Sequence, residues 1–165
     1  LYYLLAYLFM NVGAFAVVIA LGQHGEHNVT LDDFRGMGLR YPFLGVAMAL
    51  FILSMIGIPP TAGFVGKYYL FAAALSSGMP VLAILGVLNS VISLGYYLRV
   101  LVALFMMPEG RDVTIPPKGY GVKVAVAACA ACVLWFGCFV SSPISAFHGA
   151  FVQSMLQAGS IPRLP

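Results

Sequence analysis

The sequence predicts an all-α membrane protein with several spanning helices. Of its 165 residues, 62% are hydrophobic and only 8% are charged, and the mean hydropathy is +0.99. Soluble domains carry about 25% charged residues, so this composition excludes a soluble enzyme. A net charge of +3, scattered over loops, provides no basic stripe for nucleic-acid phosphates. The chain starts at Leu1 and not at Met, so we expect residues 1–165 to be one membrane domain and a fragment of a longer chain.

Four stretches are long and apolar enough to cross a bilayer, which takes about 20 residues per helix. They cover about residues 1–21, 41–75, 80–107 and 121–140. Beyond them, hydrophobic side chains recur at helical spacing over residues 144–156, but this segment is too short to span. We predict four transmembrane helices and a short C-terminal interfacial helix.

The distribution of positive charge predicts the orientation, because short cytoplasmic loops carry an excess of Lys and Arg. Loops 22–40 and 108–120 each contain two such residues, whereas the turn at 76–79 contains none. We therefore expect both loops to be cytoplasmic, and the 76–79 turn and the C-terminus to lie outside.

Loop 22–40 also contains two histidines, a residue type that binds metals in other proteins. His24 and His27 are spaced like metal ligands, but no cysteine or further histidine completes a site. Asp32, Asp33 and Arg35 are most simply a solvated loop. We predict no metal site in this loop.

The second stretch contains two adjacent prolines, Pro59 and Pro60, near its middle. Proline removes a backbone donor and clashes with the preceding helical turn. With Gly57 and Gly63 on either side, the pair should unwind the helix and leave two half-helices, with Thr61 able to cap the second. The alternative is a proline kink that only adjusts packing.

Lys67 is the one charged residue of the second stretch and lies beyond the predicted break. Its backbone is expected roughly 12 Å inside the outer boundary. One interpretation is a lysine that extends its ammonium to the outer interface. The other is an intramembrane proton carrier, because ionisable residues in spans line ion pathways and burial favours the neutral amine.

The turn at 76–79 is so short that the second and third spans must form an antiparallel hairpin. Counting outward from the turn places residues 88 and 89 at the depth of Lys67. Polar and small residues continue from there at spacings of three and four, which puts them on one face. This polar stripe comprises Gly86, Asn89, Ser93 and Tyr96 or Tyr97. The stripe either faces Lys67 or is ordinary interhelical hydrogen bonding.

Residues 57–71, GIPPTAGFVGKYYLF, closely resemble subunit N of bacterial respiratory complex I, the NADH:quinone oxidoreductase. Residues 5–15, 33–38 and 96–99 are similar to further motifs of the same family. The resemblance covers nearly the whole chain and implies the last four spans of a fourteen-span antiporter-like fold.

In that family, each antiporter-like subunit is thought to move a proton when electrons pass from NADH to quinone. The resemblance therefore implies a translocase subunit (EC 7.1.1 type) with no redox chemistry in this chain. The lysine beyond the broken span matches Lys67 and ends a chain of lysines whose earlier members belong to upstream spans. FMN, iron–sulfur clusters, NADH and quinone would bind to other subunits. The expected partners are adjacent antiporter-like and small membrane subunits, together with the lipid of a bacterial inner membrane.

Two other functions stay open from the sequence. A subunit of a multisubunit cation/proton antiporter has a similar broken span, and would lack flavin and iron–sulfur subunits. A non-transporting scaffold would use every polar group for packing. The organism, the quinone and the proton stoichiometry cannot be read from the sequence.

Overall fold

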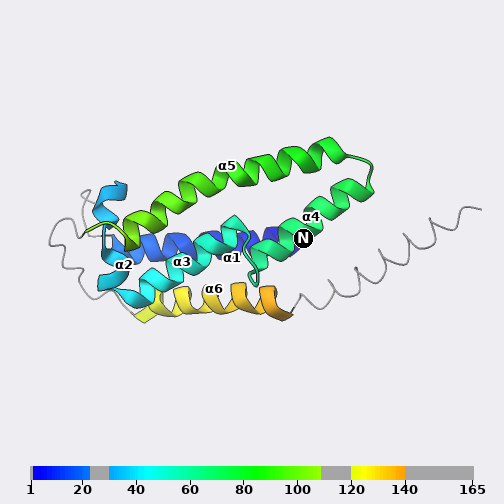
Figure 1. Cartoon of the computed structure of the whole chain (residues 1–165). Coiled ribbons are helices and arrows are strands. Elements are labelled where there is room, and N and C mark those ends of the chain that lie inside the picture. Colours follow the sequence, from blue (N-terminus) through cyan, green and yellow to red (C-terminus); the bar gives the residue numbers. More distant parts are fainter. Residues whose placement is uncertain (1, 23–29, 109–119, 140–165) are drawn as a thin grey trace, which may run out of the picture.

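The computed structural model describes residues 2–22, 30–108 and 120–139. Within these ranges every regular element is helical, which confirms the predicted all-α fold class (Figure 1). The predicted interfacial helix at 144–156 and both histidines of loop 22–40 lie outside the described residues.

The helices, in chain order, are α1 (Tyr2–Leu21), the 3-10 helix η1 (Leu31–Phe34), α2 (Met37–Arg40), α3 (Pro42–Ile56), α4 (Ala62–Ser76), α5 (Pro80–Phe105) and α6 (Tyr120–Phe139). By length and composition, α1, α5 and α6 can each cross a membrane. Helices α3 and α4 have 15 residues each, too few to span alone, and together they form the interrupted span. Pro42 and Pro80 each begin a helix, where a missing N–H costs nothing.

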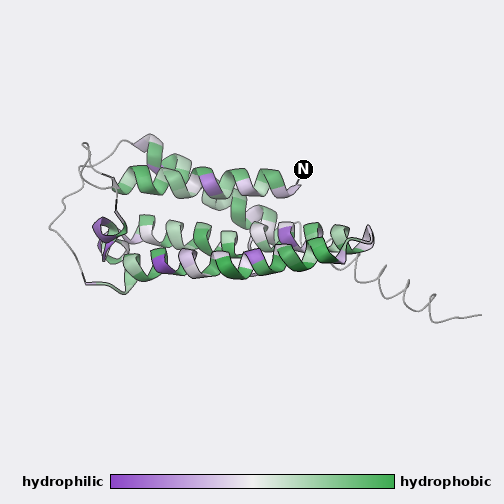
Figure 2. Ribbon diagram, turned by 90° about the horizontal axis from the view of Figure 1, so that it is seen from above, coloured by the Kyte–Doolittle hydropathy of each residue, from purple (hydrophilic) through white to green (hydrophobic). Residues whose placement is uncertain are grey.

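Helix α1 lies at the centre of the packing and contacts α3, α4 and α6. Its inner face places Met10 and Val17 in a core with Phe51 of α3 and Val126 of α6, all at most 1% exposed. Gly13 lets the ring of Phe51 lie directly on the α1 backbone, where any Cβ would overlap the ring. Figure 2 shows hydrophobic residues along all the long helices, with few hydrophilic positions among them. The outer faces are therefore suited to hydrocarbon.

A tight turn joins α4 to α5 and makes the predicted antiparallel hairpin. Gly78 in this turn has φ of 72°, a left-handed conformation that glycine adopts without steric cost. Helix α5 then returns along α4 and α3 (Figure 1). Gly86 allows the ring of Phe71 to approach the α5 backbone, because a Cβ there would lie 2.6 Å from Cε1. The hairpin thus sets the depth of α5 residues against α4.

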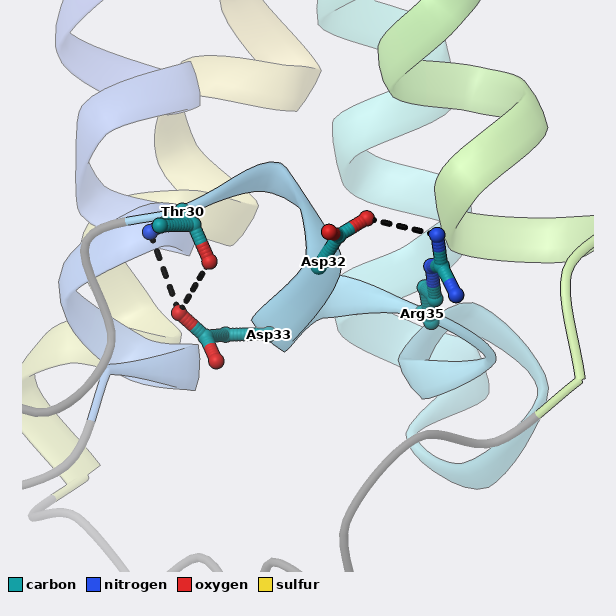
Figure 3. A network of polar contacts seen from close by, with 4 residues as sticks. All are labelled: Thr30, Asp32, Asp33 and Arg35. Atoms are coloured by element: carbon teal, nitrogen blue, oxygen red, sulfur yellow. Dashed lines mark hydrogen bonds and ion pairs between the residues drawn. The ribbon is translucent and has the colours of Figure 1, made fainter.

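The segment before α3 keeps its charged side chains at least partly exposed, as the sequence predicts, with Asp32 72% exposed, and it also forms local polar contacts. The Oδ2 atom of Asp33 accepts hydrogen bonds from the backbone N–H and the hydroxyl of Thr30, at 3.0 and 2.6 Å (Figure 3). Arg35 pairs with Asp32 at 2.7 Å. Gly36 N–H donates to the carbonyl of Ala103 on α5 at 3.1 Å. The segment therefore docks on the end of α5 and meets α3 at 117°.

Candidate functional site

The interruption between α3 and α4 has a simple backbone cause. Helix α3 ends at Ile56, and Gly57 turns the chain with φ of 94°. The carbonyl of Leu53 accepts the N–H groups of both Gly57 and Ile58, at 3.0 and 3.1 Å. This pattern closes the helix in the manner of a C-terminal glycine cap. The structure thus confirms a broken span and not a simple kink.

The end of α3 leaves its last carbonyls without helical partners. In an α-helix the N–H of residue i bonds to the carbonyl of residue i−4. Because Ile58 donates to Leu53, the carbonyls of Ser54, Met55 and Ile56 have no such donor, and Pro59 and Pro60 have no N–H that could serve the last two. A carbonyl left without a donor inside a membrane is costly.

Lys67 supplies the missing donors. Its Nζ atom donates to the carbonyl of Met55 at 2.9 Å and to that of Ile56 at 3.1 Å. The side chain folds back over Gly57, where a Cβ would lie 3.2 Å from the Lys67 Cδ atom. The ammonium therefore points toward the break and away from the Ser76 end of α4. This direction is opposite to that of a lysine that extends toward the α4–α5 turn.

A polar cavity of about 170 Å³ lies beside the Lys67 ammonium, between α1, α3, α4 and α5. Its volume has room for several water molecules, each of which occupies about 30 Å³ in the liquid. The lining side chains are mostly polar or aromatic: Tyr3, Tyr7, Met10, Ser54, Met55, Gly63, Lys67, Asn89, Ser90, Ser93, Tyr96 and Tyr97. No α6 residue is among them. The structure therefore brings the whole predicted polar stripe except Gly86 to the same cavity as Lys67.

Hydrogen bonds fix parts of the stripe to the backbone of α5. The Ser93 hydroxyl donates to the carbonyl of Asn89 at 2.7 Å, and Ser90 donates to Gly86 at 2.9 Å. The rings of Tyr96 and Tyr97 lie 4.5 Å apart, which answers the sequence alternative by placing both tyrosines at the site. The stripe is thus a fixed polar wall opposite Lys67.

A second, apolar recess of about 350 Å³ also has Lys67 in its lining, and it lies between the end of α3, α4 and α5. Phe64, Tyr68 and Phe71 line it from α4, and Val87, Val91 and Leu94 line it from α5. Apart from Tyr68, Lys67 and Ser90 are the only described lining residues with a polar side chain. Lys67 therefore lines both a polar space and an apolar one.

The structure corrects the prediction that Thr61 caps α4. Thr61 occupies the cap position, but its hydroxyl donates to the carbonyl of Ile58 at 2.7 Å and accepts nothing from α4. The N–H of Gly63 instead donates to the Ser54 hydroxyl at 3.1 Å. Threonine can satisfy a nearby carbonyl as readily as a helix N–H, and here the broken backbone offers one.

Sequence reasoning missed Ser54 and the carbonyls of Met55 and Ile56. A lone serine in an apolar run gives no pattern, so Ser54 could not be singled out. The two carbonyls could have been found, because they lie four residues before Pro59 and Pro60.

These features define a polytopic helical membrane protein with an interrupted span and an ammonium group at the break, facing a polar intramembrane cavity. The family model described as "NADH:quinone oxidoreductase/Mrp antiporter, TM" matches residues 1–93, and the chain belongs to this family.

Individual relatives carry the same description in more detail. The chain is 52% identical over 112 residues to NADH-quinone oxidoreductase subunit N of Trichlorobacter lovleyi, covering 68% of this chain and 23% of that protein. It is 39% identical over 158 residues to subunit N of Paramagnetospirillum magneticum, covering 96% of this chain and 32% of that protein. The chain therefore spans about a quarter to a third of the length of these relatives.

A solved structure shows the same fold. A chain of respiratory complex I from Thermus thermophilus, determined with bound aureothin, aligns with a TM-score of 0.71 and 34% identity. The alignment covers 82% of this chain and 31% of that one. The helical arrangement is thus shared with a chain of that respiratory complex I.

Proposed function

We propose that this chain is the C-terminal part of an antiporter-like subunit of a proton-pumping NADH:quinone oxidoreductase, in which Lys67 receives and releases a proton. The observation that carries the proposal is the Lys67 ammonium at 2.9 and 3.1 Å from two carbonyls freed by the helix break, beside a polar cavity. The assignment to this complex is supported by the two relatives, both named NADH-quinone oxidoreductase subunit N.

The geometry suits reversible protonation. An ammonium has three donors, and the carbonyls of Met55 and Ile56 use two of them. The third is available to water in the cavity. When that proton leaves, the neutral amine still has two N–H donors for the carbonyls, and its lone pair can accept the next proton. The lysine therefore need not leave its position to change its protonation state.

The rest of the machinery belongs to other parts of the complex. The proton would reach Lys67 from lysines on upstream spans of the longer chain. Electron transfer from NADH through FMN and iron–sulfur clusters to quinone would take place in other subunits. Among the described residues, no three His, Cys, Asp or Glu side chains are grouped to hold a metal ion. The partners would be neighbouring antiporter-like and small membrane subunits in a bacterial inner membrane.

The orientation is part of this proposal. Loops 22–40 and 108–120 would face the cytoplasm, with the α4–α5 turn and the C-terminus outside. Arg35 and Arg40, at the docked segment before α3, support this orientation through the positive charge of cytoplasmic loops.

The second candidate function is a cation/proton antiporter subunit, because the family description includes Mrp antiporters. Purification of the intact assembly separates the two. Subunits with flavin and iron–sulfur clusters should co-purify with this chain if it belongs to the oxidoreductase, and would be absent from an antiporter.

Substitution of Lys67 tests the proton-carrier role directly. Arginine has a long stem and a permanent charge, but it stays protonated in proteins. We expect Lys67→Arg to assemble and to pump at least about tenfold less, a barrier increase of about 1.4 kcal/mol. Lys67→His, which exchanges a proton near neutral pH, should retain more activity. The measurement is NADH-driven proton uptake in inverted membrane vesicles, with the assembled complex quantified in the same preparation. Wild-type pumping by the arginine variant would leave Lys67 as an anchor only.

A further inference from the structure

Ser54 connects the two half-helices across the break. Its hydroxyl oxygen accepts the N–H of Gly63 at 3.1 Å, although the two residues lie on different helices and nine positions apart. Ser54 is completely buried, with 0% of its surface exposed. Ser54 thus lies at the wall of the polar cavity with no exposed surface, so its hydrogen bond is buried and its loss is costly.

The first turn of α4 needs this acceptor. The first four N–H groups of a helix have no partner within it. Thr61 stands at the usual capping position, but its hydroxyl is committed to the carbonyl of Ile58 at 2.7 Å. Ser54 satisfies one of these N–H groups from the neighbouring helix.

The contact also requires close approach of the two backbones. A Cβ on Gly63 would overlap the carbonyl oxygen of Ser54 and would lie 3.1 Å from the sulfur of Met10. Glycine is thus the residue that allows α4 to lie directly on the last turn of α3. Both the hydroxyl and the carbonyl of Ser54 face the same point on α4.

This point lies on the same face of α4 as Lys67. Gly63 and Lys67 are four residues apart, so they are neighbours along one side of the helix. Ser54 immediately precedes Met55, whose carbonyl accepts the Lys67 ammonium at 2.9 Å. The rotation of α4 that places Gly63 on Ser54 is therefore the rotation that places Lys67 over the freed carbonyls.

We propose that Ser54 is a positioning residue for Lys67, whose buried hydroxyl fixes α4 so that the ammonium rests on the Met55 and Ile56 carbonyls. Ser54 acts through the backbone of α4, with no proton transfer of its own. The functional part of this inference rests on the proposed role of Lys67, whereas the geometric part stands without it.

The geometric part is tested by thiol labelling at position 67. The intact assembly would carry Lys67→Cys in a background in which Cys129, Cys132 and Cys138 are replaced. The rate of reaction with a small water-soluble methanethiosulfonate reports how accessible the thiol at position 67 is from the polar cavity. Adding Ser54→Ala should change this rate by about two- to tenfold, the change in equilibrium expected when one hydrogen bond is lost.

The functional part is tested with Lys67 in place. Ser54→Thr and Ser54→Val form a matched pair, because they add the same volume and differ in the hydroxyl. We expect Ser54→Thr to pump at least threefold more protons per NADH oxidised than Ser54→Val, on the order of the hydrogen-bond contribution. Ser76→Ala is the control, since the Ser76 hydroxyl donates to Ala73 in the exposed turn and touches nothing at the site.

The outcomes separate the two proposals. Equal pumping by the Thr and Val variants at equal assembly, or unchanged labelling at position 67 with Ser54→Ala, overturns the positioning role. If Lys67→Arg pumps like the wild type while Ser54→Ala still changes the labelling rate, the proton-carrier role fails and the geometric role of Ser54 stands. If Ser54→Ala does not assemble, Ser54→Cys, with a weak acceptor of similar size, replaces it in the labelling measurement under the same criteria.

Discussion

The Nζ atom of Lys67 lies 2.9 Å from the carbonyl oxygen of Met55, the carbonyl that would bond to residue 59 in a continuous helix. Because residue 59 is proline, the helix cannot supply this donor, and a side chain from the next helix supplies it. The missing backbone donors thus link the proline pair to the lysine.

A backbone N–H restored at residue 59 should weaken the hydrogen bond between the Lys67 ammonium and the Met55 carbonyl. In Pro59→Ala, residue 59 regains an N–H that can compete for the Met55 carbonyl. We expect normal assembly but proton uptake per NADH reduced by about two- to tenfold, the range that corresponds to about 0.5–1.4 kcal/mol for one hydrogen bond. Inverted vesicles provide the measurement. Pro80→Ala is the matched control, because Pro80 begins α5, where its missing N–H has no helical acceptor. An equal effect of both changes would contradict this explanation.

Helix α6 should tolerate no side chain at Gly137. A Cβ there would overlap the carbonyl oxygen of Pro60 and would lie 2.8 Å from the N atom of Ala62. Gly137→Ala must therefore displace α6 or the break, at a cost of about 1–3 kcal/mol. The yield of assembled complex and its thermal inactivation temperature should both fall. Gly121→Ala on the same helix meets open space, so it should leave both unchanged. Equal stability of Gly137→Ala and Gly121→Ala would contradict this prediction, because it would mean that residues 57–61 can shift without cost.

Filling the polar cavity should reduce proton transfer more than it reduces stability. Asn89 lines the cavity opposite Lys67, and its replacement by leucine removes polar groups that can bind water. We expect Asn89→Leu to lower pumping about tenfold at equal assembly, equivalent to about 1.4 kcal/mol on the barrier. Ile92→Leu, at a residue that is 71% exposed and outside the cavity lining, is the control. Unchanged pumping in Asn89→Leu would assign the stripe to helix packing alone.

The orientation predicted from the positive loops can be checked in intact cells. Single cysteines at Ser77 and Asp112, in a background without native cysteines, should differ in reactivity toward an impermeant thiol reagent. We expect labelling at position 77, because the proposed orientation places the α4–α5 turn outside, and protection at position 112 until the cells are opened. Preferential labelling at position 112 would reverse the orientation.

The sequence predicts those features of the chain that depend on local chemistry. Pro59 and Pro60 predict the break, because a proline disrupts the helix in which it lies. The short turn at 76–79 allows depth to be counted along the hairpin, and this counting correctly brings Asn89 and Ser93 to the cavity of Lys67. Both predictions use distances along the chain that secondary structure converts directly into positions.

Features that depend on packing between helices could not be predicted in the same way. Thr61 has the right residue type for a cap, yet its hydroxyl bonds to Ile58, because the turn of the broken backbone brings that carbonyl closer. Ser54 becomes the acceptor for α4 only after α3 and α4 are placed against each other. The docking of residues 31–40 on α5 likewise depends on contacts with Ala103 and Leu104, far away in the sequence.

The two spaces beside Lys67 differ in the charge state that each can accommodate. A charged ammonium keeps its solvation in the 170 Å³ polar cavity, but would be stripped of it in the 350 Å³ recess lined by Phe64, Phe71 and Val91. If Lys67 carries a proton, as we propose, only the neutral amine could enter the recess without this cost. The recess would then accommodate a lysine that has already released its proton and exclude one that still holds it.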